Sequence, residues 1–385
     1  MRPQRRRVLA LVLALPLLGV LGFAVWLAQL PPRRTPSPGA PVPGVEHAAA
    51  VRALAWRGEG RPLIAVVGIN DATETNDYLM TLGVLRRAGV ADVVALATAP
   101  GPVKLYPALT VLPDETTAEF DARHPGGADY IVVPAMEPMD DPAALAWIRA
   151  QAHKGAFVAS VCAGARVVAE AGLLDGKRMT THWYYRRKLE QRHPGVRYVP
   201  DRRFVVNAGI ASTTGITASL PMMLTLVEAI AGRGKAADVA RGLGVDHWDA
   251  RHDSDAFRFD QPFAVTVLRN RLAFWRSETL GITLEPGVDE VTLALTADAW
   301  SRTFRSRAVT YAAQGKVVTR SGLRIVPDRI GAPPAEGPIV PVGEQVPMRA
   351  LDQVLAAIAR RYGNDTAGVV AMQLEYPGWP APVSD

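Results

Sequence analysis

The chain has 385 residues, of which 49% are hydrophobic, so it is long enough to bury a large core and predicts two domains. Its formal net charge is +6, but residues 1–45 contain six arginines and no acidic residue, so residues 46–385 are neutral overall. This distribution excludes a broad nucleic-acid-binding face on the main part of the chain. A single cysteine excludes an internal disulfide.

The N-terminal segment predicts a membrane anchor. Residues 8–28 contain no charged side chain, and about 20 such residues are needed for a helix to cross a bilayer. The arginine cluster at residues 5–7 favours a cytoplasmic N-terminus, which places the globular part outside. We therefore expect a single-pass transmembrane helix within residues 1–30 and a Pro-rich linker over residues 31–60. Cleavage as a signal peptide, giving a secreted protein, is the alternative.

From Arg61 onwards, short apolar runs alternate with helical patterns. Strands are predicted at residues 61–70, 92–98, 128–136 and 156–161, helices at 75–90, 141–155, 164–174 and 216–232, and a hairpin at 202–215. Continuous apolar strands between helices are typical of a parallel sheet that helices cover on both faces. We assign residues 61–255 to this α/β domain.

The pattern changes near residue 255, where helix-like and strand-like segments mix with Pro-rich and Gly-rich stretches. Residues 256–385 are predicted to form a smaller α+β extension, with a helix over 348–363 and a strand over 367–376. No internal repeat is evident in the chain, and the role of the extension is left open.

The most informative residue is Cys162, which follows a predicted strand and precedes a predicted helix. In open parallel α/β sheets, ligands bind at the carboxyl ends of the strands. The pattern of residues 160–164, SVCAG, resembles the elbow that exposes a nucleophile between a strand and a helix. The helix N-terminus predicts a lowered thiol pKa and an accessible thiolate, which would oxidise readily. A buried, inert cysteine is the alternative.

Two stretches, SVCAGARVVAEAGLLDGKRMTTHW (160–183) and STTGITASLPMMLTLVEAI (212–230), resemble the ThiJ/PfpI family. The resemblance covers residues 61–232 and implies a class-I glutamine amidotransferase-like, flavodoxin-like α/β fold. The family includes the Parkinson-disease protein deglycase, PfpI-type proteases, isonitrile hydratases and the sensor halves of AraC-type regulators. Since these members differ in chemistry, the resemblance implies a fold and a site but no substrate.

The resemblance implies three site residues. Cys162 corresponds to the reactive cysteine, and Glu74 to the acid beside it, whose carboxyl would stay protonated next to a thiolate. His182 corresponds to a histidine that acts as a general base or orients a water. The alternatives are a helix-start acid for Glu74 and a structural histidine for His182.

Several positions depart from the family pattern. His182 is followed by Trp183 and Tyr184 rather than by a glutamate two residues on, which disfavours glutamine amide hydrolysis. Ala163 stands where the proteases carry a histidine, which disfavours proteolysis. Weaker candidates for oxyanion or substrate binding are Ala135, Met136, Ala163 and Thr214. The histidine spacing predicts no metal site, and we expect no cofactor.

Together these features predict a membrane-anchored hydrolase, hydratase or deglycase-like enzyme that acts on a small reactive molecule through Cys162. Its expected partners are a small-molecule substrate or ligand and the membrane, with no nucleic acid, and a homodimer is a further expectation. The alternative is a non-catalytic ligand or redox sensing module related to the AraC-type sensor domains.

Overall fold

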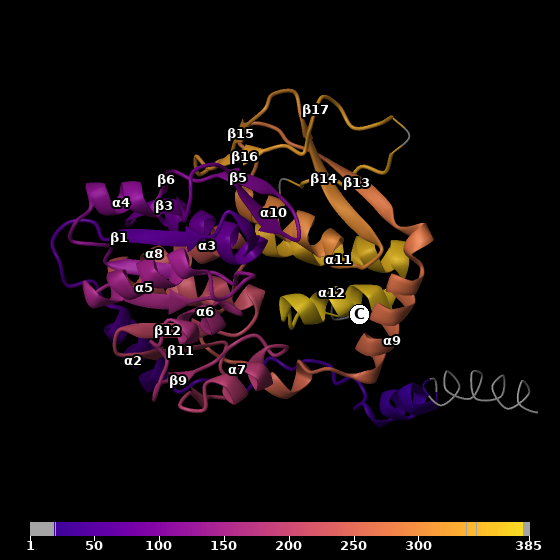
Figure 1. Cartoon of the computed structure of the whole chain (residues 1–385), viewed down its shortest axis with the longest axis horizontal. Helices are drawn as coiled ribbons and strands as arrows, with labels where there is room; N and C mark the ends of the chain where they lie inside the picture. Colours follow the sequence, from indigo (N-terminus) through magenta and orange to yellow (C-terminus); the bar gives the residue numbers. More distant parts are fainter. Residues whose placement is uncertain (1–18, 20, 336, 344, 380–385) are drawn as a thin grey trace, which may run out of the picture.

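The computed structural model describes residues 19, 21–335, 337–343 and 345–379. Its centre is a seven-stranded sheet in the order β11-β12-β8-β7-β1-β3-β6 (Figure 1). The strands are β1 (Leu63–Gly68), β3 (Asp92–Ala97), β6 (Glu115–Thr116), β7 (Tyr130–Val133), β8 (Phe157–Ser160), β11 (Phe204–Asn207) and β12 (Ile210–Thr213). All neighbours are parallel except the β11–β12 hairpin, so the predicted parallel sheet and the predicted hairpin are confirmed.

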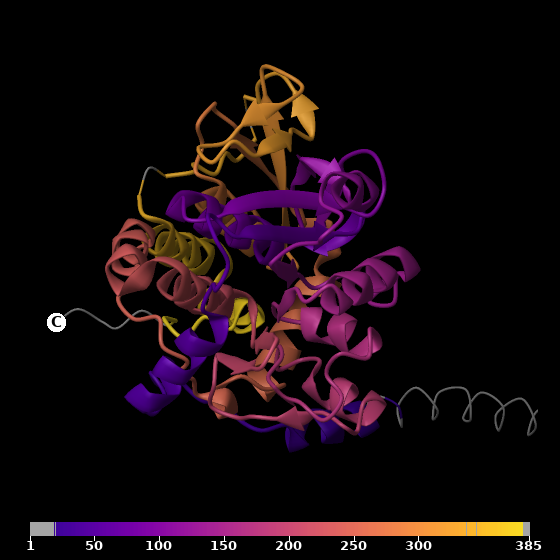
Figure 2. The ribbon, with the colours of Figure 1, turned by 90° about the vertical axis from the view of Figure 1, so that its left-hand side faces the viewer.

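Helices cover both faces of this sheet, as predicted (Figure 2). They are α3 (Thr75–Ala88), α4 (Thr117–Arg123), α5 (Pro142–His153), α6 (Gly164–Glu170), α7 (Arg186–Arg192) and α8 (Ser219–Leu243). Alternate residues of β1 enter two different hydrophobic clusters, because successive side chains of a strand point to opposite faces. Ile64 and Val66 belong to the cluster that contains α3 and α8, and Ala65 and Val67 to the one that contains α5 and α6.

Local signals fix the ends of these helices. The Asp141 side chain accepts a hydrogen bond from the Ala144 N–H at the start of α5, and Pro142 occupies the first turn. Gly89 ends α3 with φ 65°, a left-handed conformation that glycine adopts without steric cost. These signals are visible in the sequence, which is why the two helices were predicted within a few residues.

The N-terminal predictions are only partly covered. Residues 21–29 are helical, whereas residues 1–18 and 20, which hold most of the predicted transmembrane segment, lie outside the described residues. The predicted anchor is therefore not confirmed. Among the described residues, one helix is long and apolar enough to cross a membrane, Ile216–Leu243, and it is largely buried inside the protein.

The predicted linker over residues 31–60 is not a free spacer. Arg33 pairs with Asp260 at 3.2 Å, and the Ser37 hydroxyl donates to the Asp253 carboxylate at 2.8 Å. Helix α2 (Gly44–Leu54) follows and packs against α8 and β11. The prolines suggested a spacer, but an alanine-rich helix and these ionic contacts attach the segment to the domain.

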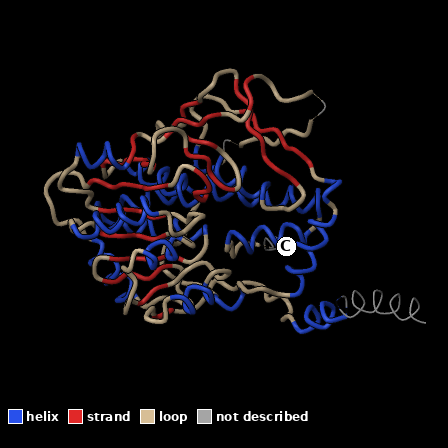
Figure 3. Tube along the Cα trace, viewed as in Figure 1, coloured by secondary structure: helices blue, strands red, loops and turns tan. Residues whose placement is uncertain are grey.

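The extension contributes strands to two further sheets, of which one also contains strands of the first part of the chain (Figure 3). One has the order β15-β16-β5-β4-β2 and the other the order β13-β14-β17. The strands are β2 (Asp71–Glu74), β4 (Val103–Tyr106), β5 (Thr110–Leu112), β13 (Glu278–Thr283), β14 (Ser306–Ala312), β15 (Val317–Val318), β16 (Arg324–Val326) and β17 (Arg329–Ile330). A separate pair joins β9 (Arg178–Met179) to β10 (Arg197–Tyr198).

The extension shares its core with the α/β domain. Its helices are α9 (Gln261–Leu272), α10 (Glu290–Ser301), α11 (Pro347–Tyr362) and α12 (Asn364–Leu374), and α10 packs directly on α3. One hydrophobic cluster contains Ile64, Leu82, Leu295 and Leu374, so the predicted boundary near residue 255 does not mark a break in the core.

The strand predicted over residues 367–376 is wrong, because this segment belongs to α12. Its buried residues Ala367, Val370, Ala371 and Leu374 follow the i, i+3, i+4, i+7 spacing of a helix face. The β-branched residues between them favoured a strand, but packing against α9 and α11 decides the conformation.

Candidate functional site

Cys162 lies in a tight turn between β8 and α6. Its φ is 57°, a left-handed backbone conformation that is uncommon for residues other than glycine. The Cys162 N–H donates to the Thr213 hydroxyl at 2.9 Å, and its carbonyl accepts from the Thr181 hydroxyl at 3.0 Å. A Cβ on Gly164 would lie 2.1 Å from the Val133 carbonyl oxygen, so the turn requires glycine there. The predicted elbow is present.

The thiol itself is buried, with only 4% of Cys162 exposed. Burial raises the pKa of the Cys162 thiol well above its ordinary value, and the nearby carboxyl groups of Asp77, Glu74 and Glu375 raise it further. The Ala163 N–H lowers this pKa, but by less. The predicted low-pKa thiolate is therefore wrong for this arrangement, since desolvation and three acidic neighbours outweigh the helix N-terminus.

Glu74 ends β2 and caps α3, which confirms the interpretation as a helix-start acid, while its role in a site stays a prediction. Its Oε2 accepts from the Asp77 N–H at 2.6 Å, as a helix-capping acid does. Its Oε1 accepts from Nη2 of Arg302 at 2.6 Å. Burial raises the pKa of the Glu74 carboxyl well above its usual value, with Asp77 and Asp298 adding to the effect. A protonated Glu74 beside Cys162, as expected from the resemblance, is consistent with that direction.

A buried acidic cluster surrounds Glu74. Burial raises the pKa of Asp77 to about 7, and it also raises the pKa of Asp298. Arg302 is the cation of this cluster, and its Nε donates to Oδ1 of Asp298 at 2.5 Å. The sequence reasoning missed these three residues. Asp77 stands three positions after Glu74 and Arg302 four after Asp298, which are helix-neighbour spacings, but no local pattern joins α3 to α10.

His182 is held by backbone groups. Its Nε2 lies 2.9 Å from the Gln373 carbonyl oxygen, and its Nδ1 accepts from the Tyr184 N–H at 3.2 Å. These contacts assign the proton to Nε2, and burial lowers the pKa of the ring. The role of general base stays a prediction, because His182 would first have to release one of these partners.

Glu375, which the sequence reasoning missed, enters the site from the end of α12. Its carboxylate accepts from the Trp183 N–H at 2.7 Å and from the Gly215 N–H at 2.8 Å. His252 Nε2 lies 3.6 Å from the same carboxylate, and Glu375 is 1% exposed. The C-terminal extension thus covers the elbow on the side of residues 182–184.

Of the four weaker candidates, Ala163 reaches the sulfur through its N–H. The Ala135 N–H instead donates to Asp77 at 3.0 Å. Met136 is buried beside Thr73. The Thr214 N–H donates to the Arg203 carbonyl at 2.7 Å, and its buried hydroxyl has no hydrogen-bond partner among the described residues. An oxyanion at the sulfur would therefore rely on Ala163 first.

Tyr185 is a further neighbour of Cys162. The thiol contributes to raising the pKa of the half-buried Tyr185 hydroxyl, although burial is the main cause. The guanidinium of Arg166 stacks 4.4 Å from the Tyr185 ring centre and lies 3.5 Å from the exposed Glu137 carboxylate.

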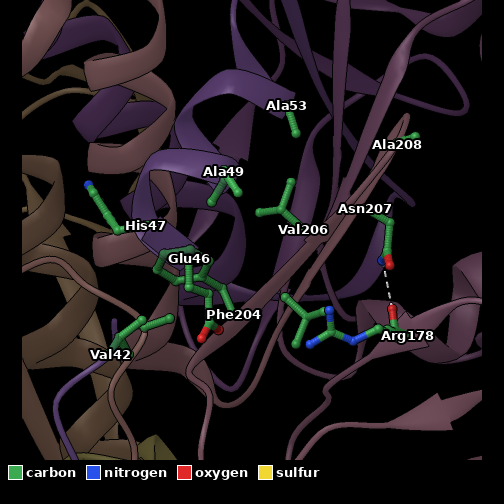
Figure 4. A pocket seen from close by; sticks show the side chains of 13 residues that line it. Val42, Glu46, His47, Ala49, Ala53, Arg178, Phe204, Val206, Asn207 and Ala208 are labelled. Carbon is green, nitrogen blue, oxygen red and sulfur yellow. Dashed lines mark hydrogen bonds between the residues drawn. The ribbon is translucent and has the colours of Figure 1, made fainter. Parts of the chain in front are cut away.

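A separate cavity of about 270 Å³ lies between α2 and β11 (Figure 4). None of Cys162, Glu74 and His182 lines it. Its polar side chains are largely paired: Glu46 with Arg202 at 2.6 Å, His47 with Glu228 at 3.0 Å, and Asn207 with the Arg178 carbonyl at 2.7 Å. Within the described ranges, no group of three His, Cys, Asp or Glu side chains is arranged to hold a metal ion.

Known proteins share this domain. A profile described as the DJ-1/PfpI family matches residues 64–229. An isonitrile hydratase from Pseudomonas putida is 43% identical over 109 residues, which are 28% of this chain and 44% of the hydratase. Protein dj-1beta from Drosophila melanogaster is 26% identical over 184 residues, which are 46% of this chain and 95% of that protein.

A regulator and a solved structure are also similar. The HTH-type transcriptional regulator CdhR from Pseudomonas aeruginosa is 28% identical over 137 residues, 35% of this chain and 40% of the regulator. The matches thus span less than half of the hydratase and of the regulator. The crystal structure of Drosophila melanogaster DJ-1beta has a TM-score of 0.44 and 24% identity, covering 49% of this chain and all of that one.

The matched residues contain the parallel sheet, the elbow with Cys162 and the acid Glu74 at the end of β2. Residues 64–229 are a domain of the DJ-1/PfpI family.

Proposed function

We propose that this protein is an enzyme that adds water to a small electrophilic molecule through Cys162. The observation that carries the proposal is the left-handed turn at Cys162, where a thiol, the Ala163 N–H and the buried Glu74–Asp77 carboxyl pair meet. A packing cysteine needs neither a strained turn nor acidic neighbours. The similarity to an isonitrile hydratase supports hydration as the reaction class.

The raised thiol pKa requires a base when the substrate arrives. Burial raises the pKa of Asp77 to about 7, so this carboxyl group can exchange a proton near neutral pH. For an isonitrile R–NC, the sulfur bonds to the terminal carbon while that carbon gains a proton, which gives a thioimidate, R–N=CH–S–Cys. Water then adds to the same carbon, the C–S bond breaks, and the N-substituted formamide leaves as the thiol recovers its proton.

The test is a substrate screen of the purified full-length chain with isonitriles, dicarbonyls and amides, beside Cys162→Ser. We expect turnover of at least one isonitrile, with formamide as the product, and a loss of at least about 100-fold in Cys162→Ser, the scale of removing a covalent nucleophile. Unchanged turnover in Cys162→Ser would contradict a catalytic role for the thiol. If the wild-type protein turns over none of the compounds, the proposal that it is an enzyme is contradicted.

A sensing module is the second candidate, and the burial of Cys162 favours it. A thiol that is 4% exposed and has a raised pKa is poorly prepared to react, but a ligand can still bind beside it. The similarity to the regulators CdhR and GbdR supports this candidate. Saturable binding of a screened compound without turnover, retained in Cys162→Ser, would favour the sensor.

We also propose that the protein is anchored in a membrane by residues 1–30, with its globular part extracytoplasmic. The motivation is the arginine cluster at residues 5–7 before the uncharged run 8–28. Alkaline phosphatase fused after Asp385 should be active in cells. An inactive phosphatase fusion beside an active cytoplasmic reporter at the same position would reverse the topology. N-terminal sequencing that begins near residues 28–35 would show a cleaved signal peptide instead.

A further inference from the structure

Two parts of the chain follow the same order of elements. Apart from β2, which has no counterpart in the second part, residues 63–116 contain β1, α3, β3, β4, β5 and β6, and residues 278–330 contain β13, α10, β14, β15, β16 and β17. Each first strand begins 12 positions before its helix, at Leu63 and Thr75 and at Glu278 and Glu290. The next strands begin at residues 92, 103, 110 and 115 in the first part and at residues 306, 317, 324 and 329 in the second, so their spacings are identical.

The strand pairings match as well. β1 and β3 are joined by six parallel pairs, and so are β13 and β14. In the hairpins, Val103 pairs with Val111, and Val317 pairs with Ile325. Both hairpin turns close with the same hydrogen bond, from Leu105 N–H to Leu109 at 2.9 Å and from Thr319 N–H to Leu323 at 2.8 Å. The equivalent positions that carry identical residues in this region are Ala99 and Ala313, Gly101 and Gly315, Val103 and Val317, Leu109 and Leu323, Pro113 and Pro327, and Asp114 and Asp328.

The two parts meet across a local two-fold axis. β5 and β16 pair antiparallel, with Val111 opposite Ile325, and these two residues are equivalent. On either side, Leu112 lies opposite Arg324 and Thr110 opposite Val326, so every cross-strand pair has its mirrored counterpart. A self-complementary contact of this kind is typical of two copies of one surface.

The helices α3 and α10 repeat this reciprocity with charged groups. Arg302, near the end of α10, pairs with Glu74, the cap of α3. Arg87, the equivalent residue of α3, pairs with Asp289, the cap of α10. Residue i of one copy thus contacts residue j of the other in both directions, as an isologous interface requires.

We infer that residues 278–330 are a second, partial copy of the unit formed by residues 63–116, packed against the first as a built-in partner, and that this copy supplies Arg302 to position Glu74 in the Cys162 site. The assignment of Arg302 rests on the proposed function of that site, whereas the duplication does not. The chain contains a single cysteine, so Asp289 has no thiol beside it and the second copy serves the first.

This inference corrects the expectation that the chain has no internal repeat. Within α3 and α10, Thr81 and Thr296 and Arg87 and Arg302 are the identical equivalent residues, which is too few to notice in the sequence. It also bears on the predicted homodimer. The face of α3 and the edge of β5 that a second chain would use are covered by α10 and β16. A homodimer would need another surface.

The test compares Arg302→Met with Arg87→Met, which removes the symmetry-related ion pair far from the thiol. The groups that face Glu74 and Cys162 are Asp77, Asp298, Glu375, Tyr185 and Arg302. Because Cys162 is the single cysteine, its rate of alkylation by iodoacetamide from pH 6 to 10 reports the site without any substrate. Urea unfolding of the same full-length variants reports the packing of the two copies.

We expect both variants to lower the urea midpoint, because each removes one of two equivalent contacts. Only Arg302→Met should move the alkylation profile, toward higher pH by about one pH unit, since loss of a nearby cation disfavours every ionisation in the cluster. Arg302→Lys should restore the profile. If Arg302→Met does not fold, Glu74→Gln replaces it in the test. An alkylation profile of Glu74→Gln that stays at the wild-type position would then contradict the role of Arg302 in positioning Glu74.

Two outcomes would overturn the inference. An unchanged alkylation profile in folded Arg302→Met, or equal shifts in the two variants, would remove the role of Arg302. An unchanged urea midpoint in Arg87→Met would remove the reciprocal packing. Neither outcome depends on finding a substrate, so a failed substrate screen leaves this test intact.

Discussion

Replacement of Glu375 by alanine should both destabilise the protein and expose Cys162. The Glu375 carboxylate accepts from two backbone N–H groups, the part-buried one of Trp183 and the buried one of Gly215. A buried donor left unpaired costs about 1–3 kcal/mol, so we expect the free energy of unfolding to fall by about 2–5 kcal/mol. Urea unfolding of the full-length chain measures this loss.

The same change should accelerate alkylation of Cys162 at pH 8 at least about tenfold. The Glu375 carboxyl contributes to raising the pKa of the Cys162 thiol, so its removal increases the thiolate fraction. The substitution also loosens the contact between the end of α12 and the segment that holds His182. The two are joined next to Glu375 by the Gln373 carbonyl, which accepts from the His182 ring at 2.9 Å. Local opening at this end would give the reagent access.

Two controls separate these causes. Glu375→Gln keeps a hydrogen-bond acceptor but removes the charge, so it should raise the alkylation rate with a smaller loss of stability. The exposed Glu59, changed to alanine, should alter neither quantity. If Glu375→Ala alkylates no faster than the wild type, the end of α12 does not limit access to Cys162.

The part of the fold that local sequence determines was predictable. Strands such as β1 and β8 are mainly apolar runs, and α5 is marked by a capping aspartate next to a proline at its start and by Gly155 just after its end. Cys162 was found for the same reason, since it follows the carboxyl end of a strand, where ligands of parallel α/β sheets bind. Glu74 was found through the family resemblance and not through a local pattern.

The environment of these residues was not predictable, because it comes from distant segments. Arg302 is 228 positions from Glu74, and Glu375 is 192 positions from Trp183. No periodicity links such residues. The prediction of a lowered pKa for the Cys162 thiol was wrong for the same reason. The helix N-terminus that lowers this pKa is visible in the local sequence, whereas the burial and the carboxyl groups that raise it depend on how the extension packs.

Gly83 offers the sharpest test of the contact between α3 and α10. A Cβ at Gly83 would lie 2.6 Å from Cγ2 of Val291 and 2.9 Å from Oε1 of Glu290. Gly83→Ala should therefore lower the free energy of unfolding by about 1–3 kcal/mol, the usual cost of overpacking. At most glycine positions inside helices, replacement by alanine stabilises the protein, because alanine has the higher helix propensity.

Gly242 is the matched control, since it is an exposed glycine near the end of α8, and a Cβ added to it would have no other atom within 4 Å. Gly242→Ala should raise the free energy of unfolding by up to about 1 kcal/mol. The comparison removes the propensity gain common to both sites and leaves the clash with α10.

A second substitution locates the clash. Val291→Ala removes the methyl group that the new Cβ would meet, so Gly83→Ala together with Val291→Ala should cost less than the sum of the two single changes. Val291 is the equivalent in α10 of Asn76 in α3, and Asp298, the equivalent of Gly83, contacts Asn76. Strict additivity, or a Gly83→Ala chain as stable as the Gly242→Ala chain, would show that α3 and α10 are not packed as two copies of one helix across a two-fold axis.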